Sequence, residues 1–435
     1  MFLRIFMSRY PNSTLRRTVT TMEPYIVKQT ITNKDQKTVG YEIMYADDQV
    51  EMWQADDTTA ANAVETFLSS IDSENFIGGK TAYITFTRNL LVKNIPKMFD
   101  TDKLVIQIED GLITNPMSHS LITKFKQAGY KIAVIDFEFA PRYFSVLDIV
   151  DYIKVNFKNH NDPTLENVIR IGRSFGKGMI AYNIDCAEAY EKAKLYGCIS
   201  FQGSYVSEKM PAALQKSKVM QGNFMMLMVA VNRDEPDIDE IEEIVSHDVS
   251  LTYALLKLVN SAYFALRNRA KSVKQALVIL GLGQLKQWIY LLSFKTDDGT
   301  MPDELIKLSF LRGSFCAELV EFADNMPISR SEAYLMGMFS TLGKLMQMPI
   351  DEVLAKLPIS DDIKLALTDH AGRSGMLFDA VIAYENAEWS KMKNLADKLG
   401  IPKEIISEKY CECVQRVNNT WAKLMQAEHF DEDDE

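Results

Sequence analysis

The first half of the chain alternates between short hydrophobic segments and longer amphipathic stretches. We expect strands at Tyr25–Thr32, Val39–Tyr45, Ala82–Thr87, Leu104–Glu109, Ile132–Phe137, Tyr152–Phe157, Gly178–Ile184 and Ile199–Val206. The apolar run at the start of the fifth segment is typical of a parallel strand that is buried on both faces. Helical hydrophobic spacing is found between strands at Ala61–Ile71, Pro116–Ala128 and Ala187–Tyr196.

The connection between the first two predicted strands decides how they pair. Asn33–Gln36 is rich in turn-forming residues and too short for a crossover helix, so these strands form an antiparallel hairpin. The remaining strands have mostly helical connections, which predicts an α/β fold: a modified β/α barrel of the TIM type with an antiparallel first strand. A doubly wound open sheet is the alternative. The barrel is favoured because polar residues end most of the strands.

Helical periodicity dominates the second half, after a change of character at Lys216–Met226. Asp237 followed by Glu240 predicts a capping box, and Gly281–Gly283 interrupts a later helix. We therefore expect an all-helical second domain. The predicted organisation is an N-terminal tail at 1–23, a barrel domain at 24–212, a helical domain at 213–428 and an acidic tail at 429–435.

Composition narrows the possible functions. The chain has 48 basic and 59 acidic residues, and the resulting charge of −11 disfavours binding to nucleic acid through phosphate contacts. No apolar run approaches the ~20 residues of a membrane-spanning helix, and the N-terminus lacks the apolar core of a secretory signal. The five cysteines are scattered, which indicates a reduced, cytoplasmic chain without a zinc site. We expect no membrane association.

The candidate chemistry lies in the first half. Asp136 and Glu138 lie at the carboxyl end of the fifth predicted strand, and active sites of parallel α/β folds lie at the carboxyl ends of strands. The sequence contains no glycine-rich phosphate-binding motif of the usual kinds. In the second half, His247 and Asp248 form the sole adjacent His-Asp pair, which we interpret as an exposed histidine and a capping aspartate at a helix start.

Several short motifs, in their order and spacing, resemble the EAL domain of cyclic di-GMP phosphodiesterases. They are Gly40–Met44, Asp136–Phe137, Tyr152–Val155 and Phe201–Tyr205. The resemblance covers roughly Tyr25 to Pro211. It implies a barrel with an antiparallel first strand and a site that hydrolyses a phosphodiester with two divalent cations.

The resemblance also implies which site residues are kept and which are replaced. Glu42, Asp136, Lys154 and Gln202 match the family pattern. Other positions of the site carry Thr85, Gln107, Ile135, Glu138, Asn156 and Tyr182. These replacements supply few anionic oxygens for cations, although Glu109 lies on the same strand face as Gln107. We therefore expect a degenerate domain with no metal, no cofactor and no catalytic residues, and no enzyme activity. The retained residues form either a remnant nucleotide-binding site or buried ion pairs in the barrel mouth.

The second half resembles the HDOD domain, a helical relative of metal-dependent hydrolases. The resemblance is carried by Ser246–Leu251, Leu255–Phe264 and Ala276–Gly281. Ser340 and Thr341 stand where a hydrolase would carry its His-Asp pair. The combination is similar to bacterial EAL–HDOD signalling proteins.

Three functional hypotheses follow. The first is a non-catalytic signalling protein that binds a protein partner through the helical domain, with a homodimer as a further possibility. The second is a sensor that binds cyclic di-GMP without turnover. The third is a weak phosphodiesterase with a rearranged site around Glu42, Glu109 and Asp136.

Overall fold

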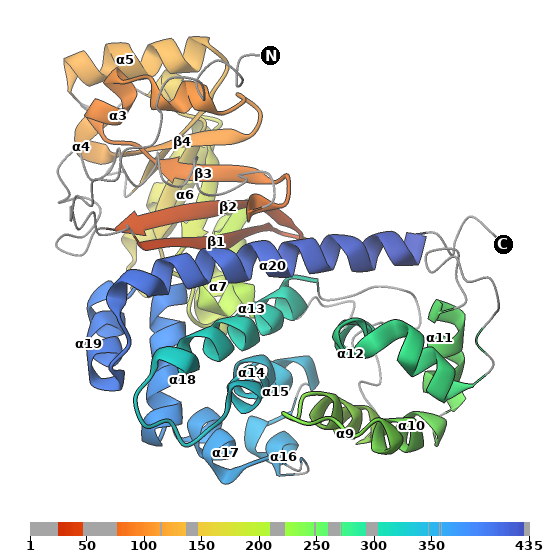
Figure 1. Ribbon diagram of the computed structural model, residues 1–435. Coiled ribbons are helices and arrows are strands. Elements are labelled where there is room, and N and C mark those ends of the chain that lie inside the picture. Colours follow the sequence, from red (N-terminus) through yellow and green to blue (C-terminus); the bar gives the residue numbers. More distant parts are fainter. Residues whose placement is uncertain are drawn as a thin grey trace, which may run out of the picture.

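The computed structural model describes residues 25–46, 76–113, 115–135, 147–208, 222–247, 249–259, 270, 272–292, 303–346, 348–355, 357 and 359–429. Two halves lie side by side, a barrel and a helical assembly, and a long C-terminal helix runs along the barrel between them (Figure 1). No helix in the described ranges combines the length and the apolar character needed to cross a membrane.

The strands of the first half form a closed barrel in sequence order. They are β1 (Tyr25–Asn33), β2 (Thr38–Ala46), β3 (Thr81–Thr85), β4 (Leu104–Glu109), β5 (Lys131–Ile135), β6 (Tyr152–Asn156), β7 (Gly178–Tyr182) and β8 (Ser200–Gln202). β1 is antiparallel to both of its neighbours, β2 and β8, whereas β2 to β8 are parallel to one another. The prediction of a barrel with an antiparallel first strand is confirmed, and the open-sheet alternative is wrong.

Helices and one 3-10 turn cover the outside of the barrel. They are α3 (Arg88–Val92), η2 (Ile95–Met98), α4 (Asp110–Ile113), α5 (Pro116–Gln127), α6 (Thr164–Ser174), α7 (Ala187–Tyr196) and α8 (Ser204–Ser207). The predictions at Pro116–Ala128 and Ala187–Tyr196 are confirmed. Asn115 caps α5 by accepting hydrogen bonds from two backbone N–H groups of its first turn. The helix expected at Ala61–Ile71 lies outside the described residues.

The strand expected at Ile199–Val206 is shorter than predicted. β8 ends at Gln202, and Gly203 adopts φ 148°, which turns the chain into α8. A Cβ atom at this position would lie 2.2 Å from the main-chain oxygen of Ile184, so the turn requires glycine. The fifth strand ends at Ile135, and the predicted Asp136 and Phe137 lie outside the described residues.

The second half is helical, as predicted. Its elements are α9 (Gly222–Val231), α10 (Ile238–Ser246), α11 (Val249–Val259), α12 (Val273–Leu292), α13 (Asp303–Leu319), η6 (Val320–Phe322), α14 (Arg330–Phe339), α15 (Leu342–Met346), α16 (Ile350–Leu354), α17 (Asp361–Thr368), α18 (Gly372–Glu385), α19 (Trp389–Leu399) and α20 (Lys403–His429). Gly281 interrupts α12 with a φ of 71°, which confirms the predicted break.

The predicted capping box at Asp237 is half correct. The Asp237 side chain accepts from the backbone N–H groups of Asp239 and Glu240 and caps α10. The carboxylate of Glu240, however, forms an ion pair with Arg233. A complete capping box is formed instead by Ser329 and Glu332 at the start of α14.

The two halves share a packed interface at β1. The rings of Tyr25 and Trp389 stack with centroids 5.6 Å apart, and Asn418 of α20 donates a hydrogen bond to the main-chain oxygen of Phe76. β1 pairs with β8 through Ile31–Asn33 in the described register, so the earlier part of β1 presents its edge to the helical half. The boundary predicted at 212/213 falls in the undescribed stretch 209–221 and stays a prediction.

Candidate functional site

Glu42 lies at the centre of a polar cluster inside the barrel. Its Oε1 atom accepts hydrogen bonds from Lys154 Nζ at 2.8 Å and from Gln107 Nε2 at 2.7 Å. Its Oε2 atom accepts from Gln202 Nε2. The structure therefore brings together three of the four predicted site residues, Glu42, Lys154 and Gln202. The fourth, Asp136, lies outside the described residues.

Strand periodicity explains why these side chains meet. Ile31, Tyr83, Val105, Ala133 and Ile180 form an apolar cluster inside the barrel. Side chains on a strand return to the same face every second residue. Gln107 therefore follows Val105 on the inner face of β4, and Lys154 likewise follows Tyr152 on β6. One layer of the interior is thus apolar and the adjoining layer is polar.

Gln107 has a role that the sequence did not indicate. The resemblance places this neutral side chain at a metal-ligand position, but in the structure it donates a hydrogen bond to Glu42 and is fully buried. The same amide group also donates to Thr85 Oγ1 at 3.3 Å. The available signal was its position two residues after an inward-facing valine.

The electrostatics of the cluster favour the ionised form of Glu42. Burial disfavours the charge, but the Lys154 ammonium and the hydrogen bonds from Lys154, Gln202 and Gln107 outweigh this effect and hold the pKa of Glu42 below its ordinary value. Lys154 is 1% exposed, and its Nζ atom lies 5.1 Å from the ring centroid of Tyr182. The prediction of a buried ion pair is an accurate description of Glu42 and Lys154.

Two acceptors in this cluster lack a donor. The carbonyl oxygens Gln107 Oε1 and Gln202 Oε1 are buried and have no hydrogen-bond partner within the described residues. An unmatched buried acceptor costs about 1–3 kcal/mol, and a ligand or water that donates a hydrogen bond removes this cost. The cluster therefore offers a cation, a carboxylate and two acceptors at one place.

Other site positions named in the sequence analysis have no described contact with Glu42. Glu109 ends β4 and its side chain is exposed, and Glu138 lies outside the described residues. Asn183 donates a hydrogen bond to Asn156 at 3.1 Å, on the neighbouring ends of β7 and β6.

The described residues can be tested as a cation site. Among them, no group of three or more His, Cys, Asp or Glu side chains lies close enough together to hold a metal ion. Glu42 supplies one carboxylate, and a cation there would compete with the ammonium of Lys154. These residues alone do not fit a two-metal site. The predicted lack of a metal stays a prediction because Asp136 is outside the described part.

Hydrogen bonds connect this cluster to the helical half. Gln202 Nε2 donates to Gln29 Oε1 at 2.9 Å, and Gln29 Nε2 donates to the main-chain oxygen of Glu385 at 3.1 Å. The Glu385 carboxylate accepts from Arg312 Nε at 2.9 Å, and Arg312 Nη2 contacts Glu208 at 2.8 Å. A continuous polar path thus leads from the barrel interior to α13 and α18.

Arg312 is the buried cation of this path. Burial opposes its charge, but Glu385 and Glu208 outweigh that effect and raise the pKa of Arg312. Burial also raises the pKa of Glu385, although Arg312 opposes the rise. Arg312 further contacts the hydroxyl of Ser340 at 3.3 Å. Ser340, predicted to replace a hydrolase histidine, therefore contributes to this network.

His247 lies between two helices of the helical half. His247 is exposed, as predicted, but it lies at the C-terminal end of α10, where a ring nitrogen contacts the main-chain oxygen of Glu243 at 2.7 Å. The next helix, α11, begins at Val249, so the His247-Asp248 pair directly precedes a helix start, as expected. The predicted cap Asp248 lies outside the described residues.

Comparison with known proteins identifies the first part of the helical half. Residues 219–357 match the HDOD domain. The chain carries an HDOD domain. The predicted resemblance to the HDOD domain is confirmed for residues 219–357, which include α9 to α16, whereas the predicted bounds of 213–428 stay a prediction.

Two relatives resemble the chain over most of its length. YuxH, an uncharacterized protein of Bacillus subtilis, is 27% identical over 409 residues, which cover 92% of this chain and 99% of YuxH. CdgJ of Vibrio cholerae, a cyclic di-GMP phosphodiesterase, is 27% identical over 396 residues, covering 89% of this chain and 91% of CdgJ. The solved structure of the EAL enzyme Bd1971 with cAMP and cyclic di-GMP matches 42% of this chain and 61% of that chain, with a TM-score of 0.36 and 15% identity.

The similarity to CdgJ corrects one prediction. From the replaced acids we predicted that the chain is not an enzyme, yet a relative aligned over 89% of this chain is a phosphodiesterase by name. The prediction that the chain has no enzyme activity is therefore wrong.

Proposed function

We propose that this chain is a cytoplasmic signalling protein that responds to cyclic di-GMP. The barrel domain, 24–212, receives the dinucleotide beside Glu42, Lys154, Gln202 and Asp136, and the helical domain, 213–428, binds a protein partner. The observation that carries the proposal is the pair of buried acceptors, Gln107 Oε1 and Gln202 Oε1, next to a buried ammonium. The likeness to CdgJ supports cyclic di-GMP as the ligand.

The chemistry of the cluster matches that of the dinucleotide. Cyclic di-GMP carries two phosphodiester anions and guanine N–H donors. The Lys154 ammonium provides a positive charge for a phosphate, and the two amide oxygens accept hydrogen bonds from N–H groups. Glu42 keeps Lys154 in place through the 2.8 Å contact.

The polar path supports a response in the HDOD domain. Gln202 contacts both Glu42 and Gln29, and Gln29 contacts Glu385. A ligand that reorients the Gln202 amide changes the partner of Gln29, which lies at the interface of the two halves. A protein partner on the helical domain, or a second copy of the chain, would detect this change.

Phosphodiester hydrolysis is the second candidate function. The full-length likeness to CdgJ favours it, and Glu42 is an ionised acid inside the barrel. Hydrolysis in the EAL family relies on divalent cations, for which Glu42 would supply one oxygen ligand.

One titration tests both functions. Purified protein is titrated with cyclic di-GMP by calorimetry, with and without Mg²⁺ or Mn²⁺, and the products are separated by chromatography. We expect saturable binding that Gln202→Leu weakens by about tenfold, since this variant removes a buried polar contact. Lys194→Met, at a partly exposed lysine of α7, is the matched control and should bind normally.

The results separate the alternatives clearly. Metal-dependent formation of linear dinucleotide that Glu42→Gln abolishes would assign the chain as a phosphodiesterase. Binding without product would assign it as a sensor. Neither binding nor product at millimolar cyclic di-GMP, in protein whose melting is cooperative, would contradict both functions.

A further inference from the structure

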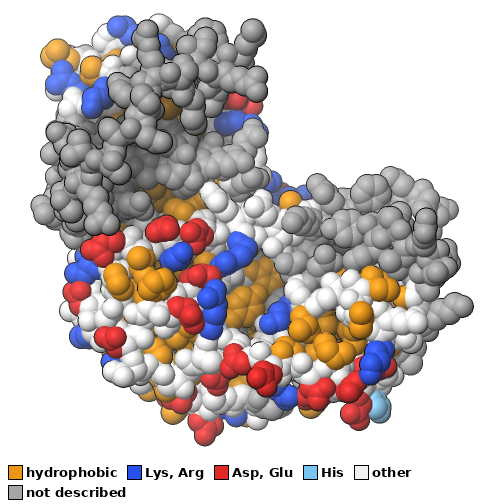
Figure 2. Space-filling view, viewed as in Figure 1, with side chains coloured by type: hydrophobic (Ala, Val, Ile, Leu, Met, Phe, Trp, Pro, Cys, Tyr) orange, Lys and Arg blue, Asp and Glu red, His pale blue; other side chains and the backbone are white. Residues whose placement is uncertain are grey.

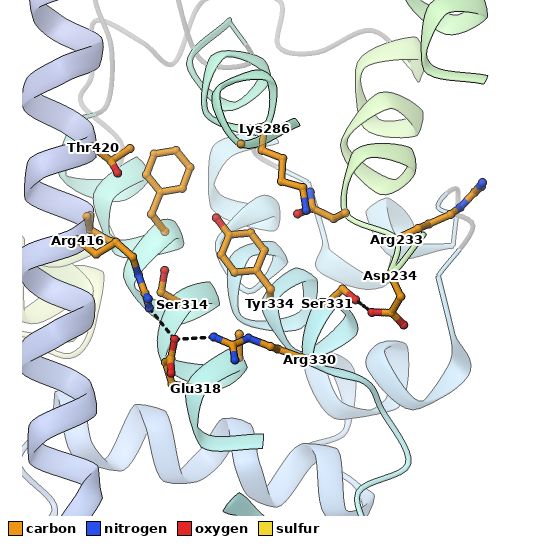
Figure 3. A pocket seen from close by; sticks show the side chains of 15 residues that line it. Arg233, Asp234, Lys286, Ser314, Glu318, Arg330, Ser331, Tyr334, Arg416 and Thr420 are labelled. Carbon is orange, nitrogen blue, oxygen red and sulfur yellow. Dashed lines mark hydrogen bonds and ion pairs between the residues drawn. The ribbon is translucent and has the colours of Figure 1, made fainter. Parts of the chain in front are cut away.

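A pocket of about 440 Å³ lies in the helical half, away from the Glu42 cluster. Its walls come from α12, α13, α14, α20 and the segment after α9 (Figure 3). This volume is within the range of about 300–1,000 Å³ that is typical of small-molecule sites. On the face seen in Figure 2, basic and acidic side chains of the helical half are interspersed among hydrophobic ones.

Two arginine side chains of the pocket share a single carboxylate. Arg330 and Arg416 both point to Glu318, and their Nη2 atoms lie 2.7 and 3.0 Å from the same carboxylate oxygen (Figure 3). These contacts use one nitrogen of each guanidinium, and a guanidinium has five N–H donors. One carboxylate therefore serves two cations, which leaves this side of the pocket electropositive.

Lys286 adds a third cation. In Figure 3 it lies on the opposite side of Tyr334 from Glu318, while Arg233 points away from the pocket. Half-burial lowers the pKa of Lys286, and Asp234 opposes this effect only in part. Asp234 itself accepts a hydrogen bond from Ser331. An ammonium that is partly withdrawn from water is stabilised by an anion that binds beside it.

The rest of the lining is suited to a planar ring. Phe310 and Val417 are buried and apolar, and Tyr334 contributes a second aromatic ring. Burial raises the pKa of Tyr334, so its phenol stays protonated and able to donate a hydrogen bond. Aromatic rings in a polar pocket stack with nucleobases in a manner tolerant of base identity.

We propose that this pocket binds a nucleoside phosphate, with Lys286 contacting the phosphate and the ring lying against Phe310 and Tyr334. The guanidinium groups of Arg330 and Arg416 add positive potential. A phosphate monoester carries a charge of about −1.5 to −2 at neutral pH, which complements the excess of cationic over acidic side chains in the lining. The helical half would then have a ligand of its own, independent of the barrel.

The test uses the full-length chain and the adenosine, guanosine, cytidine and uridine 5′-monophosphates. Calorimetry should detect saturable binding of at least one of them, with no comparable binding of the uncharged nucleosides or of inorganic phosphate. Lys286→Met should weaken the binding by about tenfold or more, because it removes a charge-assisted hydrogen bond. Lys286→Arg should restore it.

Lys274→Met is the matched control. Lys274 lies on the same helix, is exposed, and pairs with Asp239 outside the pocket. This variant should bind like the unmodified protein. Failure of all four monophosphates to bind at millimolar concentration would overturn the proposal. Binding that Lys286→Met leaves unchanged, in protein that melts cooperatively, would overturn it as well, as would nucleosides or inorganic phosphate that bind as tightly as the monophosphates.

Discussion

The hydroxyl group of Tyr384 contacts both backbone polar atoms of Ile26. It accepts a hydrogen bond from the Ile26 N–H at 3.2 Å and donates one to the Ile26 oxygen at 2.8 Å. Tyr384 belongs to α18, whereas Ile26 lies on the edge of β1 that faces the helical half. The Tyr384 hydroxyl thus satisfies the backbone N–H and C=O groups of Ile26, which a neighbouring strand would otherwise pair with. This contact joins the two halves.

Removing this hydroxyl should destabilise the protein. Tyr384→Phe leaves a buried N–H and a buried carbonyl of Ile26 without their partner, which costs about 1–3 kcal/mol. Urea unfolding measures the loss. Tyr196→Phe, at a partly buried tyrosine of α7, is the control and should change stability little. Equal stability of the two variants would contradict the role assigned to Tyr384.

Replacing Arg312 should destabilise the protein more than replacing Tyr384. Arg312→Met leaves the carboxylates of Glu208 and Glu385 without their cation, and breaking a buried pair in this way costs about 3–5 kcal/mol. Arg233→Met removes a surface pair with Glu240 and should cost less than about 1 kcal/mol. Denaturant titration of both variants provides the comparison, and a similar loss in each would show that the polar path does not stabilise the interface.

The lowered pKa of Lys28 should make the free energy of unfolding depend on pH in the alkaline range. Burial lowers its pKa from 10.5 to about 8; Glu304 opposes the shift and Lys307 adds to it. Between these values the unfolded chain holds a proton that the folded chain has lost. Stability attributable to Lys28 should therefore rise with pH from 8 to 10.5, by up to about 1.4 kcal/mol per pH unit.

The measurement compares variants over this pH range. Lys28→Met should lack the rise, so the stability difference between it and the unmodified protein should change from pH 8 to 10.5. Lys34→Met, at an exposed lysine of the hairpin turn, should follow the unmodified protein. Parallel curves for all three proteins would show that Lys28 titrates normally in the folded state.

Gly337 lies where α13 and α14 pack closely, and the structure leaves no space there for a larger side chain. A Cβ atom there would lie 2.3 Å from the main-chain oxygen of Arg312, so Gly337→Ala should force the helices apart and cost about 1–3 kcal/mol or more. Gly283 lies in α12, and among the described residues no atom beyond its own helical turn lies within 4 Å of an added Cβ. Gly283→Ala should be neutral or stabilising by up to about 1 kcal/mol. Thermal melting separates the two, and comparable melting points would be unexpected.

The strand and helix pattern was largely readable from the chain because it depends on local periodicity. The parallel strands alternate with amphipathic segments, and each predicted strand that is described overlaps an observed one. β8 ends earlier than the sequence predicts. Gly203 turns the chain where its backbone packs closely against Ile184, and this contact between distant residues is not visible in the sequence. Glu42, Lys154 and Gln202 were selected by resemblance, and the structure places them in contact.

The sequence by itself determined the two halves, the antiparallel first hairpin and three of the residues in the polar cluster. Those features follow from periodicity, loop length and motif order, which act over short stretches of chain. The tertiary structure decided the contact of Gln107 with Glu42, the link from Gln29 to Glu385 and the pocket around Lys286. Each of these joins residues far apart in the chain, so it depends on barrel closure and helix packing, which no local pattern encodes.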